Sequence, residues 1–285
     1  MMPDSSMPVS TTALTGRPRG VGARTRTRVR LGELWIDSLT FAEALDEVAE
    51  LVRAGAGGAV YTPNVDHVML AEAHAGFREA YEHTSLSLAD GMPLLWASRL
   101  LGTPLPEKVS GSDLVMPIAA LAAARGWGVY LLGGAPGVAE EAAARLRRFC
   151  GVRIVGCDTP QIALDGGCEA DRLVIERIRR AAPQIVFVAL GAPKQELWIR
   201  RTLPHVRPAV LVGIGASLDF VAGRVRRAPP WISSLGLEWL YRLGQEPRRL
   251  WRRYLVRDPQ FLLVALRMLR VARRERLRVM ESAAQ

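Results

Sequence analysis

Cysteine and histidine are scarce in this chain of 285 residues, which contains three cysteines and four histidines. Cys150, Cys157 and Cys168 follow no CxxC spacing, and no cluster of histidines accompanies them. This pattern is typical of reduced thiols and provides neither a disulfide framework nor a recognisable metal site. We therefore expect no metal ion and no cofactor.

Long apolar runs are also missing, because no segment approaches the roughly 18 uninterrupted apolar residues that a membrane-spanning helix needs. Residues 1–30 contain no apolar segment of the kind found in a signal peptide, and they are rich in Ser, Thr, Pro, Gly and Arg. We predict that residues 1–30 form a disordered leader and that the protein stays in the cytoplasm.

The common nucleotide-binding signatures are absent as well. The chain has neither a GxGxxG motif nor the GK[ST] sequence of a P-loop. The glycine spacing argues against a dehydrogenase with a Rossmann fold, for which no acidic ribose partner is apparent either.

The net charge of +10 is unevenly distributed. Residues 1–30 carry six arginines and one aspartate, and residues 224–285 carry fifteen arginines and five acidic residues. The part between them has an excess of acidic residues. A strongly basic end indicates an anionic partner, which is either a membrane surface or a nucleic acid.

From residue 31 onward, short apolar segments alternate with amphipathic ones. Strands are predicted in "AVYTPN", "LSLA", "WGVYLLGG", "VRIVGC", "QIVFVALG" and "PAVLVGIG", and helices over residues 65–82, 112–126, 138–151, 169–182 and 194–203. This alternation predicts an α/β fold, a Rossmann-like and mostly parallel sheet with helices on both faces. We expect an α/β domain over 31–223 and a helical appendage over 224–285.

Asp90 follows the predicted strand "LSLA" directly and precedes a predicted helix. A carboxylate at this place can cap the helix, or it can act as a general base at the carboxyl end of the sheet, where ligands bind in such folds. The two interpretations predict different effects of its loss, on stability in the first case and on rate in the second.

Polar residues and glycines follow other predicted strands. Each group also has a purely structural interpretation as a turn or a helix cap. Thr62, Asn64 and Asp66 can hold sugar hydroxyls, and Gln195 can donate and accept hydrogen bonds at once. Asp219 can contact a base or a ribose, or it can lock the glycine turns around it. Gly133 and Gly134 can let a phosphate approach the following helix.

The C-terminal segment predicts a basic amphipathic helix. One face carries Phe261, Ala265, Met268, Leu269 and Ala272, and another carries Arg267, Arg270, Arg274 and Arg278. Such a helix is typical of a protein that lies on an anionic membrane. A dimerisation helix and a nucleic-acid-binding segment are the alternatives, and the apolar face argues against nucleic acid.

The motifs "TPN", "ADG", "GGAPG", "LGAPKQE", "GIGASLDF-AG-RAPPW" and "GLEWLYRL-EPRRLWRRYL" occur in this order. Together they resemble the WecG/TagA/CpsF family of bacterial glycosyltransferases over about residues 31–265. The resemblance implies transfer of an N-acetylmannosamine-type sugar, or a related one, from a UDP-sugar to a sugar on undecaprenyl diphosphate. It also implies that the protein acts at the inner face of the cell membrane, in the assembly of teichoic acid or another surface polysaccharide. A homo-oligomer is a separate expectation.

The resemblance further implies roles for individual residues. Asp90 matches the family's base. Lys108 stands where relatives often have arginine, and a lysine keeps the positive charge but lacks the two parallel N–H donors of a guanidinium. The polar residues of the family's pocket match Thr62, Asn64, Gln195 and Asp219. The appendage arginines thought to reach the diphosphate match Arg242, Arg249 and Arg252. Since the chain has no DxD motif, we expect arginines rather than a metal to neutralise the leaving UDP. The main alternative function is a non-catalytic, membrane-attached protein that binds nucleotide sugars.

Overall fold

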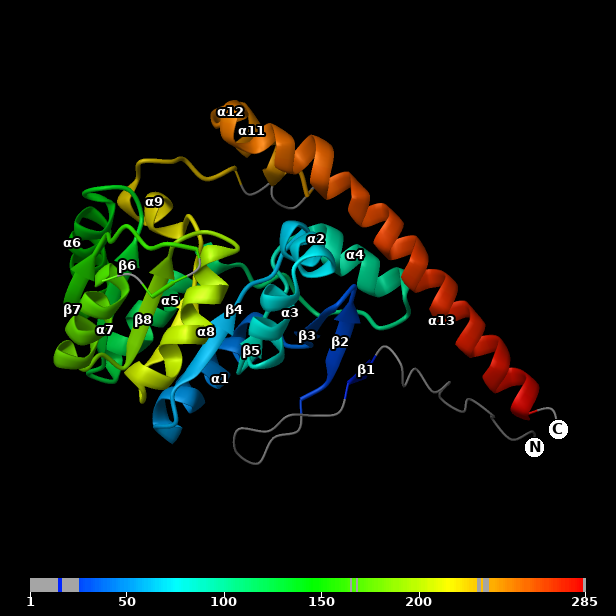
Figure 1. Cartoon of the computed structure of the whole chain (residues 1–285), viewed down its shortest axis with the longest axis horizontal. Helices are drawn as coiled ribbons and strands as arrows, with labels where there is room; N and C mark the ends of the chain where they lie inside the picture. The colour runs from blue at the N-terminus through cyan, green and yellow to red at the C-terminus, as the bar shows by residue number, and fades with distance from the viewer. Residues whose placement is uncertain are drawn as a thin grey trace.

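The computed structural model of the chain describes residues 15–16, 26–164, 166–167, 169–229, 232 and 236–283. In this part, six strands form a parallel sheet in the order β5-β4-β9-β8-β6-β7. Helices cover both faces of the sheet, and a long helical segment follows at the C-terminus (Figure 1). The predicted α/β architecture is confirmed.

The strands and helices follow one another closely. The strands of the parallel sheet are β4 (Gly58–Tyr61), β5 (Leu86–Ser87), β6 (Gly128–Gly133), β7 (Arg153–Asp158), β8 (Ile185–Ala189) and β9 (Val210–Gly213). The helices of the core are α1 (Phe41–Ala54), α2 (Val65–Ala73), α3 (Ala75–Glu82), α4 (Met92–Leu100), α5 (Gly111–Ala124), α6 (Val138–Cys150), α7 (Glu169–Ala181), α8 (Lys194–Val206) and α9 (Ser217–Ala222).

Each face of the sheet has its own apolar core. On one face, strand side chains pack against α1, α5, α6 and α9, with Val48, Leu114 and Leu146 fully buried. On the other face they pack against α3, α7 and α8, with Phe77 and Trp198 fully buried. Burial on both faces explains why the strands are almost continuously apolar in sequence.

A small antiparallel sheet precedes the parallel one. It contains β1 (Thr15–Gly16), β2 (Arg28–Leu31) and β3 (Leu34–Asp37). The predicted leader is therefore too long, because Arg28 belongs to a strand and both Arg26 and Arg28 are buried. Arg26 Nη1 lies 3.4 Å from Glu47 Oε2, and Arg28 Nε lies 3.5 Å from Asp37 Oδ1. The rest of the predicted leader, apart from β1, falls outside the described residues.

The helix predicted over residues 65–82 is two helices, α2 and α3, which separate at His74. The backbone of His74 is extended, and its imidazole accepts a hydrogen bond from the amide of Phe77. His74 thus caps α3 in the way that a serine or aspartate usually does.

The appendage is helical, as expected. It comprises α11 (Glu238–Gln245), α12 (Pro247–Arg252), the π-helical turn η1 (Arg253–Arg257), the 3-10 turn η2 (Asp258–Gln260) and α13 (Phe261–Ala283). Figure 1 shows α13 as a single long helix that runs from α12 along the side of the molecule that holds α2 and the β2–β3 hairpin.

The apolar face of α13 is covered by the core and does not face solvent. Val264, Met268 and Ala272 are buried, and the amide of Gly32, in the β2–β3 hairpin, lies 2.9 Å from Met268 Sδ. The prediction that this face lies on a membrane is therefore corrected. Other apolar side chains of α13 remain exposed, namely Leu262, Leu263, Leu266 and Val271.

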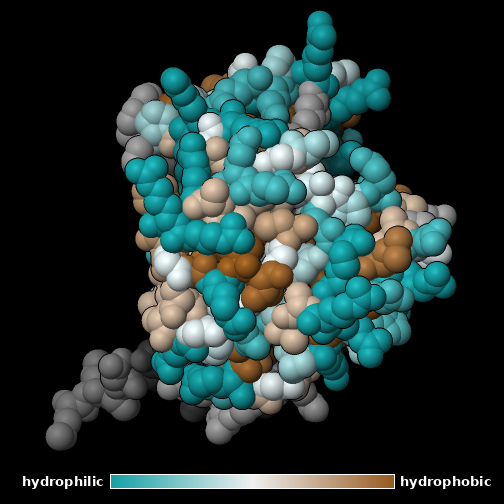
Figure 2. All heavy atoms as spheres, turned by 90° about the vertical axis from the view of Figure 1, so that its left-hand side faces the viewer, coloured by the Kyte–Doolittle hydropathy of each residue, from teal (hydrophilic) through white to brown (hydrophobic). Residues whose placement is uncertain are grey.

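The opposite end of the molecule is the sheet edge at β7. Figure 2 shows this side, where hydrophilic side chains surround a smaller group of apolar ones. Phe149 of α6 and Leu173 of α7 are among the exposed apolar residues. Arg153 begins β7 and is exposed, and a charged residue on an edge strand opposes pairing with another sheet.

Within the residues that the structure describes, no helix has both the length and the apolar character needed to cross a membrane.

Candidate active site

A cavity of about 520 Å³ lies at the carboxyl ends of β4, β5, β8 and β9. The loops after these strands form one side of it, and α11, η1 and η2 of the appendage form the other. Its volume is in the range of small-molecule sites, and its place is the one where ligands bind in parallel sheets. The cavity therefore lies between the core and the appendage.

Asp90 lines this cavity and is only partly exposed. The N-cap of α4 is Gly91, and no described side chain caps that helix. Burial raises the pKa of Asp90 to about 6, against the opposing effect of Lys108 and Arg242. The geometry thus gives no support to the interpretation of Asp90 as a helix cap, and the carboxylate can accept a proton near neutral pH.

Two predicted cations lie near Asp90 in the cavity wall, Lys108 and Arg242. Lys108 Nζ lies 3.4 Å from Asp113 and 3.7 Å from Glu238 of α11. Burial opposes the charge of Lys108, but these acidic neighbours and Asp90 outweigh it and raise the pKa. Lys108 is therefore charged, and it contacts the appendage as well as the core.

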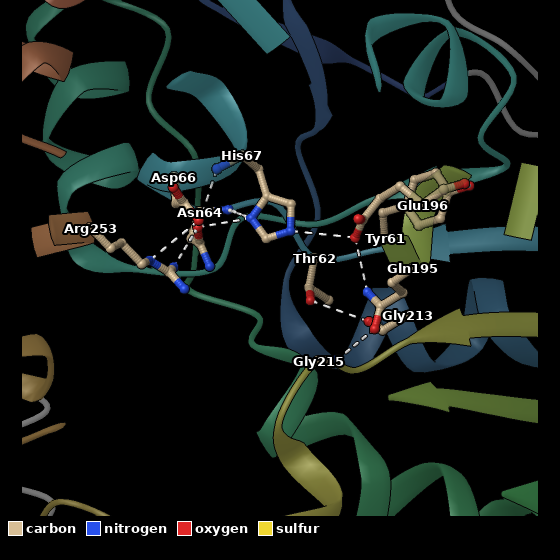
Figure 3. Close-up of polar contacts among 10 residues, drawn as sticks. All are labelled: Tyr61, Thr62, Asn64, Asp66, His67, Gln195, Glu196, Gly213, Gly215 and Arg253. Atoms are coloured by element: carbon tan, nitrogen blue, oxygen red, sulfur yellow. Dashed lines mark hydrogen bonds and ion pairs between the residues drawn. The ribbon is translucent and has the colours of Figure 1, made fainter. Parts of the chain in front are cut away.

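Gln195 and Thr62 form the floor of the cavity (Figure 3). Gln195 Oε1 accepts a hydrogen bond from the amide of Gly215 at 2.8 Å, and Nε2 donates to Glu196 Oε1 at 2.9 Å. The hydroxyl of Thr62 lies 3.5 Å from the carbonyl oxygen of Gly213. These contacts fix the amide of Gln195 in the cavity wall.

Asn64 and His67 connect this floor to the start of α2. Asn64 is the N-cap of α2, and its Oδ1 lies 2.8 Å from His67 Nδ1. His67 Nε2 in turn lies 3.4 Å from Glu196 Oε1 (Figure 3). His67 is buried, and it links Asn64 to Glu196, which accepts the hydrogen bond from Gln195.

Arg253 and Arg257 of the appendage also line the cavity. Arg253 Nη2 donates to Asn64 Oδ1 at 3.0 Å, and Figure 3 shows the guanidinium between Asn64 and Asp66. Arg257 Nη1 lies 2.7 Å from Asp66 Oδ1. No role is predicted from the sequence for these arginines, whereas Asp66 is one of the polar residues expected to hold a sugar hydroxyl, and the structure places it against the two arginines.

Three predicted site residues lie outside the cavity wall. Gly133 ends β6 and Gly134 follows it, and neither glycine lines the cavity. A Cβ on Gly133 would lie 2.4 Å from the carbonyl oxygen of Ala189, so packing alone explains why a glycine is needed at this position. Asp219 lies in α9, and its carbonyl oxygen accepts from the amides of Arg224 and Val225, which closes the turn after the helix.

Of the other predicted arginines, Arg252 lies away from the cavity, and the prediction for Arg249 stays untested. Arg252 is exposed, and its guanidinium lies over the ring of Trp251, 5.3 Å from the centroid. Arg252 does not line the cavity, whereas the next residue, Arg253, does. Arg249 lies in α12, and its side chain falls outside the part of the chain that the structure describes.

Among the described residues, no group of three or more His, Cys, Asp or Glu side chains is arranged to hold a metal ion. Lys108, Arg242, Arg253 and Arg257 instead give the cavity several cationic side chains. Asp66, Asp90, Glu238 and Asp258 line the same cavity, so the described part of its wall presents cations and carboxylates in equal number.

Comparison with known proteins gives two findings. The sequence model of the "Glycosyl transferase WecG/TagA/CpsF family" matches residues 29–275. The chain is also 34% identical over 200 residues to an N-acetylglucosaminyldiphosphoundecaprenol N-acetyl-beta-D-mannosaminyltransferase of Bacillus spizizenii, which covers 70% of this chain and 75% of that protein.

Proposed function

The chain belongs to the WecG/TagA/CpsF family of glycosyl transferases, and we propose that it moves an N-acetylmannosamine-type sugar from UDP to a sugar on undecaprenyl diphosphate. The name of the Bacillus relative supports both the sugar and the lipid-linked acceptor. The observation that carries the proposal is the position of Asp90, a partly exposed carboxylate in the cavity wall with Lys108 and Arg242 nearby.

In the proposed reaction, a hydroxyl of the acceptor sugar attacks the anomeric carbon of the donor. The bond from that carbon to the UDP oxygen breaks, and the hydroxyl proton passes to Asp90, which acts as the general base. The stereochemistry at the anomeric carbon is inverted. Thr62, Asn64 and Gln195 hold sugar hydroxyl or amide groups, since they present donors and acceptors at the cavity floor.

The leaving UDP carries negative charge, and Lys108, Arg242 and Arg253 neutralise it in this proposal. Full transfer activity in an excess of a chelator is the expected result, since these side chains carry the required charge. Loss of activity with the chelator and recovery on addition of magnesium would contradict this part of the proposal.

The appendage brings the site to the membrane in this proposal, with the protein peripheral on the inner face. Leu262, Leu263 and Leu266 are exposed next to Arg267 and Arg270 of α13. Apolar side chains beside arginines suit an anionic bilayer surface, where each arginine contributes about 1 kcal/mol of binding free energy.

The decisive test is transfer from a panel of UDP-sugars to a synthetic prenyl-diphosphate-GlcNAc acceptor, with wild type and Asp90→Asn compared. We expect the variant to lose a factor of about 10²–10⁴ in rate, because it lacks the base. It should bind the donor and remain folded at pH 7.5. Burial disfavours the ionised form of Asp90, so its replacement by a neutral amide removes a cost to folding above the raised pKa.

Equal transfer rates for wild type and Asp90→Asn would show that Asp90 is not the general base. Tight binding of a UDP-sugar without transfer by wild type would instead support the non-catalytic alternative.

A further inference from the structure

Two arginines of the appendage converge on one carboxylate of the core. Arg257 Nη1 lies 2.7 Å from Asp66 Oδ1, and Arg253 Nε lies 3.4 Å from Asp66 Oδ2. The side chain of Asp66 is 7% exposed, so both of its oxygens are turned toward the appendage and away from solvent. Asp66 also lies in the first turn of α2, where the helix dipole favours a negative charge.

Arg253 joins this ion pair to the ligand-binding residues. Its Nη2 donates to Asn64 Oδ1 at 3.0 Å, while its Nε faces Asp66 (Figure 3). Asn64 and Arg253 both line the cavity. Asp66 therefore lies beside Nε of the guanidinium, with Asp258 Oδ2 at 3.9 Å from the same nitrogen, and Asn64 accepts from Nη2 at the cavity wall.

A second ion pair connects the same two parts of the protein without touching the cavity. Arg267 of α13 lies 2.7 Å from Glu72 at the other end of α2. This pair is shorter than the contact of Arg253 with Asp66, but Arg267 is 54% exposed and neither residue lines the cavity. It provides a matched control, because it attaches the appendage to α2 and has no contact with Asn64.

We propose that Asp66 is a positioning residue, which seats Arg253 in the cavity where that arginine meets the diphosphate group of the substrates. The inference rests on the proposed function and extends it to a residue that acts through another, because Asp66 lines the cavity but both of its carboxylate oxygens face arginines. Arg257 contributes as the second partner of Asp66. Docking of the appendage and completion of the anion-binding side of the cavity are then one event.

The test compares wild type, Asp66→Asn and Glu72→Gln, each as the full chain, in the transfer assay with the prenyl-diphosphate-GlcNAc acceptor. Asp66→Asn keeps the shape of the side chain and removes the charge that orients Arg253. We expect kcat to fall on the order of 10–100-fold, because a misplaced transition-state contact carries such a cost. Glu72→Gln should stay within about threefold of wild type, as for a largely exposed ion pair.

Two further readouts separate positioning from folding. Asp66→Glu keeps the charge and should recover part of the lost kcat. Hydrogen exchange of the backbone amides of residues 250–261 reports docking of the appendage without any turnover, and we expect faster exchange in Asp66→Asn than in Glu72→Gln.

Equal kcat values for wild type and Asp66→Asn would overturn the proposal, and so would equal losses in Asp66→Asn and Glu72→Gln, which would reduce Asp66 to simple attachment. If wild type transfers no sugar at all, the proposed function fails. The exchange measurement then still decides, because equal exchange in the two variants overturns the role of Asp66 in docking.

Discussion

Asp90 combines two properties at the scale of a single residue. It is open to the cavity, yet burial raises its pKa to about 6. A base with this pKa is ionised at neutral pH and still binds a proton more strongly than an ordinary aspartate does. From the sequence, its position after a strand was visible, whereas its environment was set by Lys108, Glu238 and Arg242, which lie far along the chain.

The raised pKa predicts the pH dependence of the reaction. Since only the ionised carboxylate can accept the proton, kcat/KM should be constant above about pH 7 and fall about tenfold per unit below pH 6. A profile of transfer rate between pH 4.5 and 8.5 measures this, with folding followed by circular dichroism at each pH.

Asp258 provides the control for this profile, because burial also raises its pKa to about 6 and it lines the same cavity. In Asp258→Asn the inflection near pH 6 should persist. Disappearance of the inflection in this variant would assign it to Asp258 and contradict the role of Asp90.

At the scale of elements, the loop from β6 to α6 illustrates a glycine motif with a packing function. Gly133 has a φ of +100°, and β8 passes so close that a Cβ would collide with its backbone. The sequence could not separate this reason from a phosphate loop, because both require glycine between a strand and a helix.

Gly133→Ala should therefore destabilise the protein by about 2–4 kcal/mol, since both the backbone conformation and the contact with Ala189 are strained. Gly151→Ala is the matched control, as Gly151 also has a positive φ but no atom within 4 Å of the added Cβ. We expect a cost of about 1–2 kcal/mol there. Urea unfolding measures both, and equal costs would contradict the packing explanation.

A donor-binding measurement completes this comparison. Because the loop does not line the cavity, Gly133→Ala should bind a UDP-sugar with the affinity of wild type wherever it is folded. If the folded variant bound the UDP-sugar more weakly than wild type, the loop would have to be part of the donor site.

At the scale of the whole molecule, the appendage forms one wall of the cavity and also packs against the β2–β3 hairpin. Its predicted apolar face contributes Val264 and Met268 to the core. Deletion of the whole appendage would therefore expose apolar core as well as remove arginines, so point variants on the outer side of α13 give a clearer test of membrane attachment.

Leu263→Glu should weaken binding to vesicles that contain phosphatidylglycerol by about tenfold or more, since burial of a leucine is worth about 1.5–3 kcal/mol. Leu263 is 67% exposed, so the melting temperature should not change. Leu173→Glu is the control, because α7 lies at the opposite end of the molecule from α13 (Figure 1). Equal binding by both variants in vesicle sedimentation would contradict attachment through α13.

The sequence by itself determined the local features of this protein. Alternating apolar strands and amphipathic helices predicted the parallel sheet, and the polar residues after β4, β5 and β8 marked Thr62, Asn64, Asp90 and Gln195. These features follow from side-chain periodicity and from residues adjacent in the chain, which need no knowledge of neighbours in space.

Only the tertiary structure decided which of these features meet. The strand order places the ends of β4, β5, β8 and β9 around one cavity and leaves the end of β6 outside it. The docking of the appendage selects Arg253 rather than Arg252 and pairs it with Asp66, which lies 187 residues earlier in the chain. Such contacts depend on how separate elements pack, and a single sequence carries no local signal for that.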